Sequence, residues 1–164
     1  MALSLYLHPL AGFCHKVLIA LYENENEIHA ETVDFSDTGS ATALLEKWPV
    51  GKVPVLHDSA RDRIVPETSI IIEYLPQHYP DPVLLLPDDP DACLEAGLWD
   101  RFFDLYVSTP MQRIVTDRIR PQDGTDPVGV ADARKTLDTA YAMIDAQVAA
   151  NSWATGNRFT IADC

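Results

Sequence analysis

The chain has 164 residues, 47% of them hydrophobic, a size that suits one ordinary globular domain or two small ones. Its formal net charge of -13 opposes binding to nucleic-acid phosphates and to anionic membranes, because both attract basic patches. No apolar run approaches the roughly 20 residues that cross a bilayer, and residues 1–10 show no basic region followed by a long apolar segment and a cleavage site. We therefore expect a cytoplasmic protein that binds neither nucleic acid nor a membrane.

Residues 1–80 alternate between strand-like and helix-like segments, a pattern typical of α/β layers. In chain order, the predicted elements are a strand over 4–8, a helix over 14–22, a strand over 28–35, a helix over 41–48, paired strands over 53–58 and 63–65, and a helix from Thr68. Pro49 ends the second helix, because a residue before proline is pushed out of the helical region. Pro76 is expected to end or kink the third helix, because proline removes a backbone donor and clashes with the preceding turn.

Four prolines stand between residues 80 and 90, in the stretch PDPVLLLPDDP. This composition predicts a stiff, extended connection. We therefore expect one domain over 1–80, a linker over 81–90 and a second domain over 91–164, in which every predicted element is helical. In that second domain Leu94, Leu98, Phe102 and Leu105 recur on one helix face, and Pro110 kinks or restarts the helix.

A second long helix is predicted to begin at Asp126 and Pro127, an N-cap followed by proline at the first helical position. Its expected inward side chains are Val130, Leu137, Ile144 and Val148. Near the end of the chain, Phe159, Thr160 and Asp163 stand in the order of a staple residue, an N-cap and a third helical residue, which resembles a capping box. We expect this box to announce a further helix and the sequence to be a fragment.

The three cysteines, Cys14, Cys93 and Cys164, are odd in number and far apart, so they predict neither a disulfide framework nor a zinc site. His29 and His57 have no metal-ligand spacing either. We expect reduced thiols and no bound metal.

The order of strands and helices, with a proline at the start of the third strand, resembles the thioredoxin fold. The helical second half behind a proline-rich linker resembles the glutathione transferase family. Four stretches carry this resemblance, which covers the whole chain: HPLAGFCHKVLIAL, WPVGKVPVL, PETSIIIEYL and GNRFTIAD. The resemblance implies an α/β thioredoxin-like domain followed by an all-α helical domain, with glutathione as co-substrate.

The same resemblance implies a set of glutathione-binding residues. Val53 and Pro54 match the position of a cis peptide bond, which turns the backbone of Val53 toward the cysteinyl unit of glutathione. Lys52 matches a residue that reaches the glycine carboxylate. Glu67 and Thr68 match the pair at the start of the third helix, where Thr68 caps the helix and receives the γ-glutamyl carboxylate and Glu67 accepts from the α-ammonium group.

The catalytic position departs from the family pattern, because the usual serine or cysteine is replaced by Ala11. Cys14 matches a second cysteine position that is commonly buried, and Tyr6 resembles a first-strand tyrosine displaced by one residue, which reverses the face of the strand. Cys14 and Tyr6 are therefore the candidate catalytic side chains. Otherwise the backbone N–H groups of Phe13 and Cys14, together with the helix dipole, are expected to stabilise the thiolate.

Two histidines flank the same stretch. His15 falls on the first turn of the first predicted helix, where a solvated surface role suffices, and His8 stands beside Pro9, where a structural role suffices. In the helical half, an aromatic-rich run is the candidate substrate pocket or simply core; its members are Phe102, Phe103, Tyr106, Met111 and Ile114.

Three functions remain open from the sequence. The first is a glutathione transferase-like enzyme of detoxification that adds the glutathione thiolate to an electrophilic small molecule, acting as a homodimer. The second is a glutathione-dependent disulfide or peroxide reductase that uses Cys14 covalently. The third is a non-catalytic thioredoxin-fold binding module, which Ala11 and Gly12 favour.

Overall fold

The structure is a computed structural model that describes residues 2–79 and 82–164. It divides into two compact units, Met1–Leu85 with Cys164 (unit 1) and Leu86–Asp163 (unit 2). The boundary between Leu85 and Leu86 falls inside the expected linker. Pro80 and Asp81, the first residues of the proline-rich connection, lie outside the described residues.

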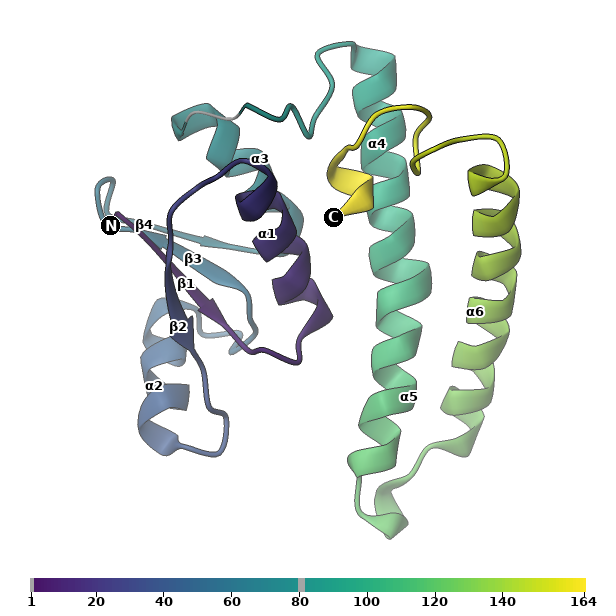
Figure 1. Cartoon of the computed structure of the whole chain (residues 1–164). Helices are drawn as coiled ribbons and strands as arrows, with labels where there is room; N and C mark the ends of the chain where they lie inside the picture. The colour runs from purple at the N-terminus through teal and green to yellow at the C-terminus, as the bar shows by residue number, and fades with distance from the viewer. Residues whose placement is uncertain (1, 80–81) are drawn as a thin grey trace. The chain divides into compact units, whose positions relative to one another are not determined.

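Unit 1 is built on a mixed sheet with strand order β2-β1-β3-β4 (Figure 1). Strand β2 runs parallel to β1, whereas β3 is antiparallel to both β1 and β4. The elements described in this unit are β1 (Leu3–Leu7), α1 (Gly12–Glu23), β2 (His29–Thr32), α2 (Thr38–Lys47), β3 (Val55–Asp58), β4 (Arg63–Pro66) and α3 (Thr68–His78). This arrangement confirms the predicted α/β thioredoxin-like domain.

Successive residues of a strand point to opposite faces of the sheet, so each face has its own set of side chains. Leu5 pairs with Leu56, and both side chains are buried on one face, which α1 and α3 cover while packing against each other. Tyr6 pairs with Val55 on the other face, where α2 contributes Leu44 to the core. The sheet is thus a layer with helices on both of its faces.

Of the two outcomes expected at Pro76, an end or a kink, the structure excludes the end, because helix α3 continues to His78. Proline at this position withdraws only the N–H that would reach the Ile72 carbonyl, and the amide of Tyr79 closes the last turn on the Leu75 carbonyl at 2.8 Å. The buried side chains of Ile72 and Leu75 hold this turn against the sheet.

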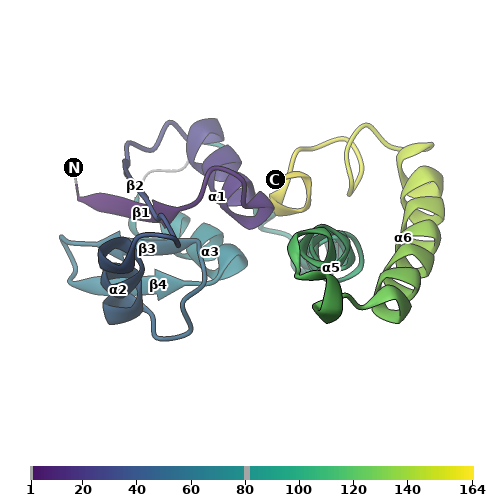
Figure 2. The same cartoon turned by 90° about the horizontal axis from the view of Figure 1, so that it is seen from below.

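Unit 2 is mostly helical, as predicted (Figure 2). Its described elements are α4 (Pro90–Phe102), the π-helical stretch η1 (Phe103–Ser108), α5 (Thr109–Ile119), the short 3₁₀ turn η2 (Gln122–Gly124), α6 (Pro127–Val148) and the 3₁₀ turn η3 (Ile161–Asp163). Helices α5 and α6 lie side by side, and α4 packs on η3.

Pro110 marks the restart of the helix, in the first turn of α5 directly after η1. Because proline has no N–H, the α-helical hydrogen bond to the Tyr106 carbonyl is missing, and the ladder changes register through the π-helical stretch. The hydroxyl of Thr109 donates to the Asp104 carbonyl at 2.8 Å within this stretch.

Of the apolar face predicted over Leu94, Leu98, Phe102 and Leu105, only Phe102 is buried. Leu94 and Leu98 are 74% and 59% exposed, whereas Trp99 and Phe102 form the core of unit 2 with Ala140 of α6. Of the residues expected to point inward from α6, Val148 is also exposed, because it is the last residue of the helix and lies past this core.

Both predicted capping motifs are present. The Asp126 carboxylate accepts from the amide of Gly129 at 2.8 Å, with Pro127 at the first position of α6. The Asp163 carboxylate accepts from the Thr160 amide at 3.0 Å, and the Thr160 hydroxyl accepts from the amide of Ala162 at 3.3 Å. The first bond is that of a capping box with aspartate in place of glutamate, and the second caps the amide of the second helical residue.

Candidate functional site

Three chain segments converge at one end of the sheet in unit 1. Tyr6 pairs with Val55, and Val55 pairs with Pro66, so the end of β1, the start of β3 and the end of β4 lie in one row across neighbouring strands. The segments that leave this row hold residues 11–14, 52–54 and 67–68. The strand register therefore gathers the glutathione-binding residues expected from the sequence at one edge of one unit.

The start of α1 offers backbone donors and no catalytic hydroxyl or thiol. Ala11 is the N-cap and makes no side-chain cap hydrogen bond. The amide of Cys14, expected to face a ligand, instead donates to the Ala11 carbonyl at 2.9 Å. Among the described residues, the amides of Gly12 and Phe13 have no hydrogen-bond acceptor, so these two are the donors that this helix start presents to an anion.

Cys14 sits in the environment of a structural thiol. Its side chain is 0% exposed, in the core formed by α1 and the sheet. Burial raises the pKa of the Cys14 thiol, and a hydrogen bond with the backbone of His8 lowers it only in part. A nucleophilic thiolate needs a lowered pKa and access to its substrate, and Cys14 has neither.

The Tyr6 side chain packs on the face of the sheet that α2 covers. Its ring lies against the cluster formed by Val33, Leu44 and Val55. The one-residue displacement noted in the sequence thus has a structural consequence, because neighbouring strand residues face opposite sides of a sheet.

The segment before β3 exposes an unpaired strand edge. The Val53–Pro54 peptide bond is cis, as predicted. Val53 is partly buried against the α2-side cluster, and its backbone groups make no hydrogen bond to any described residue. Lys52 is exposed beside it. A peptide-like ligand can pair with this edge through main-chain hydrogen bonds.

The start of α3 is strained. Glu67 is the N-cap of the helix and has φ 73° and ψ 126°, a left-handed conformation that is costly for any residue except glycine. Thr68 is the first helical residue and is buried, so it does not cap the helix, contrary to the prediction. Glu67 lies between β4 and α3, so its exposed side chain is next to the positive end of the helix dipole.

The opposite end of the sheet holds a buried charge that the sequence did not reveal. The carboxylate of Asp58 is 0% exposed and accepts the hydroxyls of Tyr74 and Tyr79, both at 2.7 Å. Burial favours a raised pKa of Asp58, but these hydroxyls and the amides of Arg61 and Ala60 outweigh it and hold the pKa below its ordinary value. Burial, with the Asp58 charge, raises the pKa of Tyr74 to about 12.

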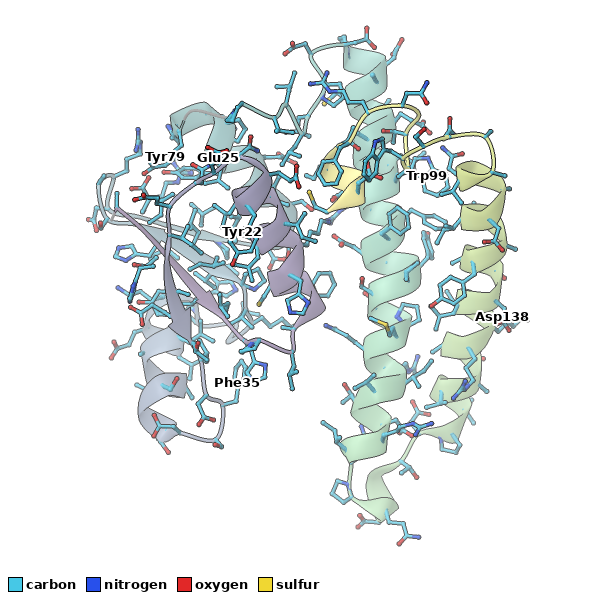
Figure 3. The ribbon with its side chains drawn as sticks, viewed as in Figure 1. Tyr22, Glu25, Phe35, Tyr79, Trp99 and Asp138 are labelled. Carbon is cyan, nitrogen blue, oxygen red and sulfur yellow. The ribbon has the colours of Figure 1, made fainter. Side chains whose placement is uncertain are left out.

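This cluster lies away from the candidate site. Tyr79 and Phe35 occupy opposite ends of unit 1 (Figure 3). Phe35 lies against His8, which follows β1 at the candidate site, with ring centroids 6.1 Å apart and the rings tilted by 42°. Asp58 therefore links the β3–β4 turn to the end of α3, away from the candidate site.

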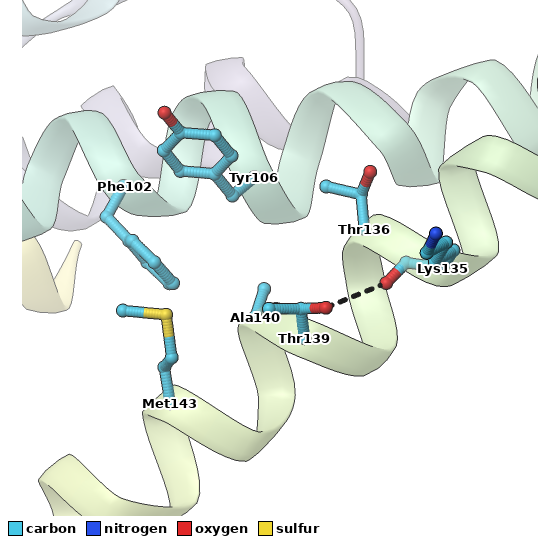
Figure 4. Close-up of a pocket in the computed structure, with 7 residues that line it drawn as sticks. All are labelled: Phe102, Tyr106, Lys135, Thr136, Thr139, Ala140 and Met143. Atoms are coloured by element: carbon cyan, nitrogen blue, oxygen red, sulfur yellow. Dashed lines mark hydrogen bonds between the residues drawn. The ribbon is translucent and has the colours of Figure 1, made fainter.

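Unit 2 contains a cavity of about 510 Å³ between η1 and α6 (Figure 4). It is lined by Phe102, Tyr106, Lys135, Thr136, Thr139, Ala140 and Met143. Phe102 and Tyr106 belong to the aromatic-rich run of the sequence, whereas Phe103, Met111 and Ile114 do not line the cavity. The lining is mainly apolar and includes two threonines, a tyrosine and a lysine.

Within residues 2–79 and 82–164, no cluster of three or more histidine, cysteine or acidic side chains could hold a metal ion. In the same ranges, none of the helices combines the length and the apolar character that a membrane crossing needs.

Comparison with known proteins connects this geometry to one family. The model of the glutathione S-transferase N-terminal domain matches residues 5–83. Glutathione S-transferase GstB of Escherichia coli K12 is 29% identical over 116 residues, which cover 70% of this chain and 55% of GstB. The chain thus spans about half the length of this relative.

Solved structures agree with the fold. A glutathione S-transferase from Methylobacillus flagellatus with GSH bound superposes with a TM-score of 0.89 at 20% identity, covering 98% of this chain and 77% of that one. One from Methylobacterium radiotolerans, in complex with glutathione sulfonate, has a TM-score of 0.82 at 29% identity, covering 98% and 73%. The matched N-terminal domain, this relative and these structures all support the glutathione S-transferase family.

Proposed function

We propose that this protein is a glutathione transferase-like enzyme that adds the glutathione thiolate to an electrophilic small molecule. The observation that carries the proposal is the convergence of the α1 start, the Val53 edge and the α3 start at one end of the sheet. Each of the three suits one part of the tripeptide. The Methylobacterium radiotolerans relative, bound to glutathione sulfonate, supports the choice of ligand.

The γ-glutamyl end of glutathione is an amino-acid zwitterion and fits the α3 start. The carboxylate of Glu67 accepts from the α-ammonium group, while the helix terminus at Thr68 attracts the α-carboxylate. The cysteinyl unit pairs with the backbone of Val53, and the exposed ammonium group of Lys52 attracts the glycine carboxylate.

The thiol is directed at the start of α1. A free thiol with a pKa near ~8.5 is mostly protonated at neutral pH, so a transferase must favour the thiolate. Ala11 offers no hydroxyl, and the buried Cys14 thiol is out of reach. The amides of Gly12 and Phe13, with the helix dipole, are the groups that stabilise the thiolate in this proposal.

A second candidate is a glutathione-binding module without transferase activity, because Ala11 leaves the family's usual catalytic position empty of a functional group. A reductase that uses Cys14 is disfavoured by the burial of that thiol and by its raised pKa.

Calorimetry with glutathione, combined with turnover assays on a panel of electrophiles, tests the proposal. Binding with turnover supports the transferase, and binding without turnover selects the module. Absence of glutathione binding contradicts both. The proposal includes a two-fold homodimer in a detoxifying role, and analytical ultracentrifugation tests the assembly, which a strictly monomeric protein contradicts.

A further inference from the structure

Two histidine side chains clasp the turn between β1 and α1. The amide of Leu10 donates to Nδ1 of His8 at 3.2 Å, and Nε2 of His15 lies 2.7 Å from the carbonyl oxygen of Pro9. An amide can only donate and a carbonyl can only accept, so Nδ1 of His8 is unprotonated and Nε2 of His15 carries hydrogen. His8 thus accepts a hydrogen bond from the turn, and His15 donates one to it.

Most backbone amides of this turn donate a hydrogen bond within the turn itself. Pro9 has none, Leu10 donates to His8 Nδ1, and Ala11 donates to the His8 carbonyl at 3.0 Å. The amides of Cys14 and His15 both donate to the Ala11 carbonyl, at 2.9 and 3.2 Å. The remaining two amides, those of Gly12 and Phe13, are the open donors of the candidate site.

Packing does little to hold this turn. Leu10 is 87% exposed, and Pro9 and Gly12 are exposed as well. The His8 ring packs against Phe35, but the exposed Pro9, Leu10 and Gly12 keep their geometry mainly through hydrogen bonds. The two imidazoles therefore restrict the directions of the following amides.

We propose that His8 and His15 are positioning residues that aim the amides of Gly12 and Phe13 at the glutathione sulfur. This inference rests on the proposed function. Since Ala11 supplies no hydroxyl, the direction of these amides decides how strongly the thiolate is favoured. In this proposal the imidazoles hold the turn through the nitrogens engaged with Leu10 and Pro9 and take no part in proton transfer.

Paired substitutions separate positioning from proton transfer. His15→Gln keeps an N–H donor near the position of Nε2, and His8→Asn keeps an acceptor near Nδ1, while neither side chain titrates. His15→Leu and His8→Leu remove the hydrogen bonds. The readouts are the pKa of bound glutathione, followed by thiolate absorbance against pH, and turnover at neutral pH.

We expect the leucine variants to raise the pKa of bound glutathione and to lower turnover about 2- to 10-fold each, the equivalent of about 0.5–1.5 kcal/mol for one hydrogen bond. The glutamine and asparagine variants retain most of the wild-type values. Affinity for S-methylglutathione, which has no thiol, is expected to stay unchanged in all four variants, because its other groups are bound by Val53, Glu67 and Thr68.

Other results overturn the inference. If the glutamine and asparagine variants lose as much turnover as the leucine variants, the imidazoles carry protons. If the leucine variants keep the thiol pKa and turnover of the wild type, the clasp has no role in thiolate stabilisation. If His8→Leu does not fold, the comparison of His15→Leu with His15→Gln tests the inference, because His15 is exposed. Wild-type protein that fails to bind glutathione disproves the proposed function itself, and the inference falls with it.

Discussion

At the scale of single residues, Glu67 combines an exposed carboxylate with a left-handed backbone. Such a conformation costs about 1–3 kcal/mol and persists where the surrounding structure enforces it. Here β4 ends at the preceding residue and α3 begins at the following one, so both elements constrain Glu67. Conformations of this kind concentrate at ligand-binding sites, which agrees with the proposed role in holding the γ-glutamyl group.

We expect Glu67→Gln to weaken glutathione binding by about 1 to 3 kcal/mol, because it removes a charge-assisted hydrogen bond while keeping the length of the side chain. Isothermal titration calorimetry measures the change. Glu73→Gln is the matched control, since Glu73 is exposed on the same helix, away from its start. Equal affinities of the wild type and Glu67→Gln would remove Glu67 from the site.

Cys14→Ala should lower the free energy of unfolding by about 1 to 2 kcal/mol, because it leaves a small cavity in the core. Glutathione affinity and turnover should remain near wild type, since the buried thiol is protonated and cannot reach substrate. Denaturant unfolding and steady-state kinetics measure the two effects. Loss of turnover in a folded Cys14→Ala variant, or a mixed disulfide of Cys14 with glutathione, would favour the reductase instead.

Ala11→Ser places a hydroxyl at the N-cap of α1, beside the open amides. We expect it to donate to the glutathione sulfur and to lower the pKa of the bound thiol, because it adds a donor to the thiolate. Thiolate absorbance against pH measures this shift, and Ala11→Gly is the control without a hydroxyl. A rise of about 1 kcal/mol in stability with an unchanged thiol pKa would mean that the hydroxyl caps the helix instead.

At the scale of elements, the carboxylate of Asp58 joins the β3–β4 turn to the end of α3. Its oxygens accept from the turn amides of Ala60 and Arg61 and from the hydroxyls of Tyr74 and Tyr79. Because the charged carboxylate is favoured in the fold, its contribution to stability is present above its ordinary pKa and is lost as the pH falls through its lowered pKa.

Tyr74 makes the stability of the fold decline at alkaline pH, whereas Asp58 makes it decline at acidic pH. Its pKa is raised from 10.0 to about 12, so the protonated phenol is favoured in the folded state. The stability that this provides is fully present below about pH 10 and is lost as the pH rises toward 12. We expect Tyr74→Phe to flatten this alkaline decline in denaturant unfolding. Tyr22→Phe, at an exposed tyrosine, is the control and should leave the decline unchanged.

At the scale of the whole molecule, all the proposed glutathione-binding residues lie in unit 1, whereas the 510 Å³ cavity lies in unit 2. Amide hydrogen exchange can separate the two regions. Glutathione should slow exchange at short times around residues 10–16, 52–56 and 66–72, because ligand contacts suppress local opening there. The middle of α6, which lines the cavity, should change little with glutathione alone; protection centred on α6 would place glutathione in the cavity of unit 2 instead.

The sequence by itself determined the order of the elements, the alternation of strands and helices in the first half and the helical second half. It also determined where α6 begins and the capping box at Thr160 and Asp163. These features depend on short-range chemistry: side-chain periodicity along one element, proline at a helix start, and caps that bond to amides two or three residues away. The matching motifs also supplied the residues of the proposed glutathione site.

Tertiary structure decided which of these residues can act chemically. Cys14, Tyr6 and the leucines of α4 have side chains whose surroundings come from other elements, so periodicity alone did not separate buried positions from exposed ones. The left-handed Glu67 is imposed by β4 and α3 together.

The hydrogen bonds of the β1–α1 turn decide two further features. They leave the amides of Gly12 and Phe13 open, and they bring His8 and His15 onto the turn. A sequence shows that a helix begins near residue 12, but which amides keep their hydrogen bonds and which face a ligand is decided only when the turn closes in three dimensions.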